Sequence, residues 1–93
     1  MATENGGKIE LKLGPITPEG AEYDATLEIP QATFHGKAQV GAKVVIFVWD
    51  GGAEPPDWIL ADARAALRAA LRTSQAEGKW PRRLTRWRPE PTA

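Results

Sequence analysis

The chain has 93 residues, with 12 basic and 12 acidic side chains, a formal net charge of zero and no cysteine. This is the length of one domain, and the lack of cysteine excludes disulfides, thiolate catalysis and cysteine-ligated metal sites. No apolar run reaches the ~18 residues of a membrane span, and the first residues do not resemble a secretory signal. We therefore expect a small soluble protein of the cytoplasm, with one folded domain over residues 8–88 between flexible segments 1–7 and 89–93.

Charge is divided unevenly along the chain. Residues 1–63 contain four basic and ten acidic side chains, a net charge of −6, whereas residues 64–88 contain eight basic and one acidic, a net charge of +7. Such a division is typical of a protein that binds a charged partner, and equally of one whose two halves neutralise each other in the fold.

Two stretches near the N-terminus alternate between apolar and polar residues, the period of a half-buried strand. Their apolar members are Ile9, Leu11 and Leu13 in the first stretch, and Tyr23, Ala25, Leu27 and Ile29 in the second. Residues 14–20 between them hold two prolines and two glycines, which predicts a turn region. In an antiparallel hairpin, Lys8 and Lys12 would lie beside acids of the second strand.

The middle of the chain predicts one weak and one strong strand. Residues 33–35 are expected to form a short edge segment before a turn at residues 36–37. Residues 43–49 are apolar on both alternating sets and rich in β-branched and aromatic side chains, which predicts a strand at the centre of the sheet.

Residues 57–77 predict a helix, because alanines dominate them, prolines precede them and Gly78 follows as a C-terminal cap. The stripe that should pack on the sheet consists of Leu60, Ala63, Leu67, Ala70, Leu71 and Ser74, with Ile59 at its margin. Residues 83–87 are long enough for a further strand. The expected fold is therefore α+β: an antiparallel sheet of three to four strands with one long helix on one face.

The residues needed for catalysis are scarce. The chain has one histidine, His35, next to a predicted turn, and one serine, Ser74, on the predicted buried stripe. Asp50, Glu54 and Asp57 cluster before the helix, where turn and helix-start roles account for them better than paired-carboxylate chemistry. Residues 50–52 lack the spaced glycines and the lysine of a phosphate loop. We therefore expect neither an enzyme nor a metal, cofactor or small-molecule substrate.

Basic residues recur in two patterns. Arg64, Arg68 and Arg72 are spaced every four residues, which places them in one row on the helix. Residues 79–89, KWPRRLTRWRP, hold five cations and two tryptophans without an acid. This segment either covers the protein's own acidic strands or presents a surface to a partner.

The interpretation we favour is a non-catalytic protein that binds a protein partner, or its own copy, through complementary acidic and basic surfaces. The alternative is binding of single-stranded DNA or RNA, with tryptophans stacked on bases. The predicted partner-binding residues are Arg64, Arg68, Arg72, Trp80, Arg82, Arg83, Arg86, Trp87 and Arg88.

Overall fold

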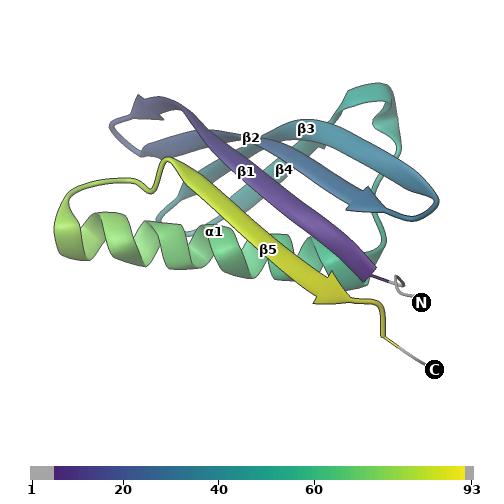
Figure 1. Ribbon diagram of the computed structural model, residues 1–93. Helices are drawn as coiled ribbons and strands as arrows, with labels where there is room; N and C mark the ends of the chain where they lie inside the picture. The colour runs from purple at the N-terminus through teal and green to yellow at the C-terminus, as the bar shows by residue number, and fades with distance from the viewer. Residues whose placement is uncertain (1–5, 92–93) are drawn as a thin grey trace.

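The computed structural model describes residues 6–91. Residues 1–5 and 92–93, which belong to the segments 1–7 and 89–93 expected to be flexible, lie outside the described residues. The elements are β1 (Gly6–Thr17), β2 (Gly20–Ile29), β3 (Ala32–Gly41), β4 (Val45–Trp49), the 3₁₀ turn η1 (Asp50–Gly52), α1 (Asp57–Glu77) and β5 (Arg83–Pro89). The five strands form one antiparallel sheet, and α1 lies across one of its faces (Figure 1). The predicted α+β class is confirmed, with five strands in place of three to four.

The order of strands across the sheet is β4-β3-β2-β1-β5. The first four strands follow one another as a meander, and α1 then carries the chain back across the sheet, so that β5 pairs with β1 (Figure 1). The two edges of the sheet are therefore β4 and β5. Within residues 6–91, no helix has both the length and the apolar character needed to span a membrane.

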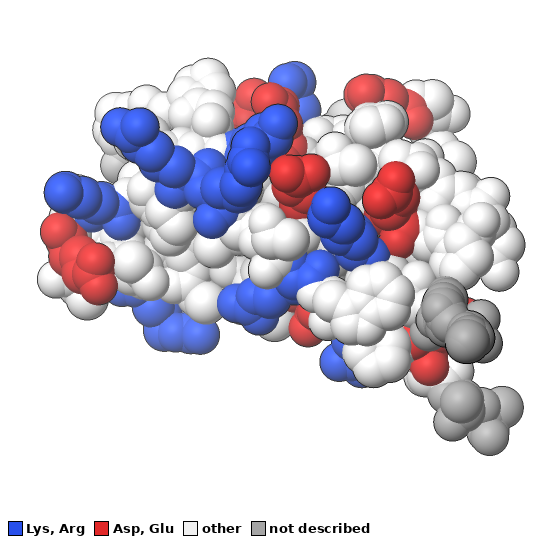
Figure 2. Space-filling view, viewed as in Figure 1, with Lys and Arg blue, Asp and Glu red and all other residues white. Residues whose placement is uncertain are grey.

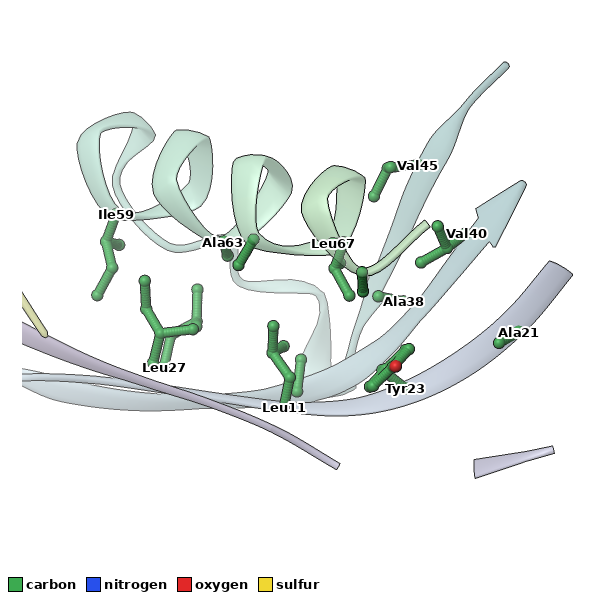
Figure 3. Close-up of a cluster of buried hydrophobic side chains, with 14 of the residues drawn as sticks. Leu11, Ala21, Tyr23, Leu27, Ala38, Val40, Val45, Ile59, Ala63 and Leu67 are labelled. Carbon is green, nitrogen blue, oxygen red and sulfur yellow. The ribbon is translucent and has the colours of Figure 1, made fainter. Parts of the chain in front are cut away.

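The core lies between α1 and the sheet face that it covers. Figure 3 shows Leu11, Tyr23 and Leu27 rising from the sheet towards the helix. All three are fully buried, as the alternation in the sequence predicts. The opposite face, which we call the open face, has no covering element among the described residues.

The helix begins and ends at the predicted residues. Pro56 precedes its first turn, and Gly78 ends it with a φ of 76°, a left-handed conformation that glycine adopts without steric cost. Its buried stripe is rotated relative to the prediction, because Ile59 is fully buried instead of marginal, while Leu60 and Leu71 are only partly buried. The buried helix residues are Ile59, Ala63, Ala66, Leu67 and Ala70.

The predicted turn over residues 14–20 is wrong for its first half. Strand β1 continues to Thr17 after a register shift between Leu13 and Ile16, and only residues 18–19 form the turn. Pro15 lies in this irregular stretch and is exposed, which is where a sheet tolerates a residue without an N–H.

Two further predictions concern β3 and β4, and both are wrong. Strand β3 has ten residues and lies inside the sheet, and Gly36 is not in a turn but packs beneath Trp49. Strand β4, expected at the centre, is an edge strand. Its Val45, Phe47 and Trp49 pack towards the helix, and the other alternating set faces solvent, which the sequence pattern does not reveal.

Candidate interaction surfaces

The predicted partner-binding residues do not form one surface. Three of them lie on α1 beside β4, whereas the other six lie on β5 or in the loop before it, at the opposite edge of the sheet. Figure 2 shows the β5 side, where basic side chains gather towards the end of the molecule at which α1 ends and β5 begins. The two groups are separate candidate sites.

The first group, which we call the arginine row, consists of Arg64, Arg68 and Arg72. The guanidinium carbon of Arg64 lies 5.5 Å from the ring centroid of Phe47 on β4, a cation–π contact that also holds the side chain against the strand. Arg68 and Arg72 line a hollow together with residues 41–45, and Lys43 adds a fourth cation there. In the described part of the chain, none of these four cations has an acidic group within 4.0 Å.

The side chains of β4 that point to the open face are exposed beside the arginine row. Val44, just before β4, and Ile46 and Val48 within it are 53%, 46% and 65% exposed, and we call these three residues the β4 apolar row. Ile46 and Val48 pair with Gln39 and Lys37 of β3, which places them on the open face. Sequence reasoning missed this row because a run that is apolar on both alternating sets is also typical of a buried central strand.

A hollow of ≈ 350 Å³ continues this apolar row on the open face. Val44, Ile46 and Pro15 are among the apolar residues that line it, and Glu19 and Glu22 are its acidic lining residues. It has room for a side chain that reaches across the edge of β4.

His35 and Ser74, two of the residues considered for catalysis, each make a local hydrogen-bond contact. His35 is exposed on β3, and its Nδ1 lies 3.3 Å from Oγ1 of Thr26. The Ser74 hydroxyl donates a hydrogen bond of 2.9 Å to the Leu71 carbonyl within the helix. Across residues 6–91, no three acidic or histidine side chains gather closely enough to hold a metal ion.

No protein-family model, curated protein or solved structure matches this chain. Its function is therefore inferred from its own surfaces.

The second group of predicted residues is split by the geometry of β5. In the register with β1, Arg86 and Arg88 pair with Ile9 and Gly7 and so share the helix side of the sheet. Arg83 and Trp87 lie on the open face, where Trp87 is 59% exposed. The tryptophan therefore points away from two of the nearest arginines.

Two of the predicted partner-binding residues, Trp80 and Arg82, lie in the loop before β5 and contact β2 and β1. Trp80 is partly buried and makes an edge contact with Tyr23, with ring centroids 6.4 Å apart. The carbonyl oxygen of Arg82 accepts a hydrogen bond of 2.8 Å from the N–H of Leu13, while the Arg82 side chain is exposed.

The open face of the sheet is balanced in charge. Strand register places four cations and four acids on it: Lys8, Lys12, Lys37 and Arg83 against Glu10, Glu22, Asp24 and Glu28. The closest pair joins Lys37 Nζ to Asp24 Oδ1 at 2.8 Å, and this hydrogen bond raises the pKa of Lys37 above its ordinary value.

The C-terminal segment does not cover the acids of β2. Because β5 pairs with β1, Arg83 approaches Glu10 of that strand, at 3.9 Å. Lys37 of β3 pairs with Asp24 and Glu22 instead. Two of the three acids of β2, Glu22 and Asp24, therefore have a partner within the sheet that does not come from the arginine-rich segment.

Proposed function

We propose that this protein is a non-catalytic interaction protein that binds an acidic protein partner on the arginine row beside β4. The observation that carries the proposal is that Arg64, Arg68 and Arg72 form one row along an edge strand with no acid within 4.0 Å in residues 6–91. A surface of this kind is unsatisfied in the isolated protein and suits a partner of opposite charge.

Electrostatics supports an acidic partner. Like charges four residues apart on a helix repel one another by a few tenths of a kcal/mol per pair, and an anionic surface alongside removes that cost. Arginine also binds carboxylates through two parallel hydrogen bonds, which lysine cannot do. The cation–π contact of Arg64 with Phe47 fixes one end of the row before a partner arrives.

A second candidate function is binding of single-stranded nucleic acid along β5. The observation that favours it is the exposed ring of Trp87, which pairs across the strands with Lys8 on the open face. An exposed ring next to a cation is a stacking platform for an unpaired base. The balanced charge of the open face and the division of the β5 arginines between two faces favour it less than the first proposal.

Two matched triple variants separate these functions. Arg64→Ala, Arg68→Ala and Arg72→Ala together remove the arginine row, whereas Arg82→Ala, Arg86→Ala and Arg88→Ala together remove three arginines at the other edge. A fluorescently labelled glutamate-rich peptide and a labelled mixed-sequence single-stranded oligonucleotide are titrated with each protein at about 50 and 200 mM salt. Chemical denaturation of each variant verifies that it is folded.

We expect the peptide to bind the wild-type protein and the variant without Arg82, Arg86 and Arg88 alike. It should bind the variant without the arginine row roughly tenfold more weakly. Equal peptide binding by all three proteins, or no peptide binding at the lower salt, would overturn the first proposal. Oligonucleotide binding that is lost only in the variant without Arg82, Arg86 and Arg88 would favour nucleic-acid binding at the β5 edge over the first proposal.

A further inference from the structure

We propose that the edge of β4 accepts an extended segment of the partner as an additional strand, and that this segment alternates between acidic and apolar residues. This inference rests on the proposed function and names how the partner binds. Four features of β4 carry it: a free backbone edge, two chemically different flanks, the absence of protecting residues and a poor fit to a second copy.

The backbone of β4 has hydrogen-bonding groups directed away from the sheet. The N–H of Gly41 donates a hydrogen bond of 2.9 Å to the carbonyl oxygen of Val44, which marks these two residues as a hydrogen-bonded pair. Because such pairs alternate in antiparallel sheets, Ile46 and Val48 also bond to β3. Val45 and Phe47 therefore direct their N–H and C=O groups outward, where an added strand finds its partners.

The two sides of the β4 edge favour different side chains in a docked strand, one apolar and the other acidic. On the open face lies the β4 apolar row, continued by the hollow of ≈ 350 Å³. On the helix side lie the arginine row and Lys43. Since successive side chains of a strand point to opposite faces, a docked strand fits both flanks only if apolar and acidic residues alternate along it.

The two edges of the sheet differ in protection. Strand β5 carries three arginines and ends in proline, residues that discourage another strand from pairing with an edge. The five residues of β4, VIFVW, include no charge and no proline. An edge of this composition promotes aggregation unless a strand or another surface covers it, so one edge is closed to pairing and the other is open.

A second copy of the chain is a poorer occupant than an acidic strand. Pairing two β4 edges about Ile46 would match the apolar rows on the open face. On the helix side, however, it would place Phe47 of each copy, with Arg64 over its ring, opposite Val45 of the other copy and next to the two-fold axis. The two arginine rows would then repel each other, whereas acidic side chains of a partner strand would neutralise them.

The test uses three labelled peptides of alternating glutamate and valine. One is unmodified, one carries N-methyl groups on its glutamates, and one carries them on its valines. All glutamate N–H groups of a docked strand point to one side and all valine N–H groups to the other. Methylation therefore removes the hydrogen bonds to β4 in only one of the two modified peptides, while the two modified peptides have the same charge and the same number of added methyl groups.

We expect the unmodified peptide and one methylated peptide to bind alike, and the other to bind at least roughly tenfold more weakly. The double variant Ile46→Lys and Val48→Lys should also bind the unmodified peptide at least roughly tenfold more weakly than the wild-type protein does. The matched control is Ile16→Lys, because Ile16 is equally apolar and 59% exposed but lies beside Trp80, away from β4.

The possible failures are distinguishable. If all three peptides bind equally well, strand addition is wrong but binding of an acidic partner stands. If none binds at about 50 mM salt, the proposed function fails as well. If sedimentation shows a dimer without peptide that dissociates in the Ile46→Lys and Val48→Lys variant, the occupant is a second copy and the inference is overturned.

Discussion

Tyr23 Oη donates a hydrogen bond of 2.6 Å to the carbonyl oxygen of Pro81, which is 58 positions later in the chain. The bond joins β2, the middle strand of the sheet, to the loop that follows α1. The ring of Trp80 packs edge-on against the same tyrosine. Tyr23 thus places the start of β5, and with it the second group of arginines, relative to the core.

Replacing Tyr23 with phenylalanine is expected to lower the free energy of unfolding by about 0.5–1.5 kcal/mol. The substitution keeps the buried ring but leaves the Pro81 carbonyl without this donor. Chemical denaturation followed by tryptophan fluorescence measures the loss. A variant as stable as the wild type would show that the hydrogen bond contributes nothing net.

Burial raises the pKa of Tyr23 from 10.0 to about 12. The fold therefore favours the neutral phenol, and its contribution to stability is complete below pH 10 and is lost as the pH rises towards 12. Within that window the free energy of unfolding should fall by about 1.4 kcal/mol per pH unit, a dependence that Tyr23→Phe removes. The chain has one tyrosine, so tyrosinate absorbance reports this group alone. Titration of the native protein near 10.0 would contradict the prediction.

Gly36→Ala is expected to destabilise the protein by about 1–3 kcal/mol. A Cβ at this position would lie 2.4 Å from the Val48 carbonyl oxygen and 2.7 Å from the Trp49 ring. Gly41 on the same strand is the matched control, because the nearest atom to its Cβ would be at 3.6 Å, an ordinary contact. Gly41→Ala should change stability by no more than about 0.5 kcal/mol. Equal effects in the two variants would rule out crowding beneath Trp49.

Ile59→Ala is expected to cost about 2–5 kcal/mol of unfolding free energy, because it leaves a cavity where a fully buried side chain was. Leu60→Ala should cost less than about 2 kcal/mol, since Leu60 is only partly buried. Thermal or chemical denaturation of the two variants compares them directly. The reverse order would mean that the helix packs with the phase predicted from the sequence.

Local patterns in the sequence predicted those features that depend only on residues close together in the chain. The helix bounds follow from the prolines before Asp57 and from Gly78, and the inward residues of β2 follow from strict alternation. The arginine row follows from its spacing. These features depend on backbone geometry alone, which a short stretch of sequence specifies.

Position within the sheet was decided by tertiary structure. Residues 43–49 have the composition of a central strand, yet nothing in them states how many neighbours β4 has. Gly36 suggests a turn, but it lies inside β3. Glycine fits there because the ring of Trp49 on the next strand occupies the space that a side chain at position 36 would take. The register shift after Leu13 likewise depends on pairing with β2.

Patterns in the amino-acid sequence alone predict an α+β domain, its helix, its two alternating strands and a division of charge along the chain. Strand pairing, in contrast, separates the basic residues into two groups at opposite edges of the sheet and places one group beside β4, an edge strand without charged residues. The two differ because sequence periodicity shows which side of an element is apolar, whereas the neighbours of an edge strand depend on pairing between distant segments.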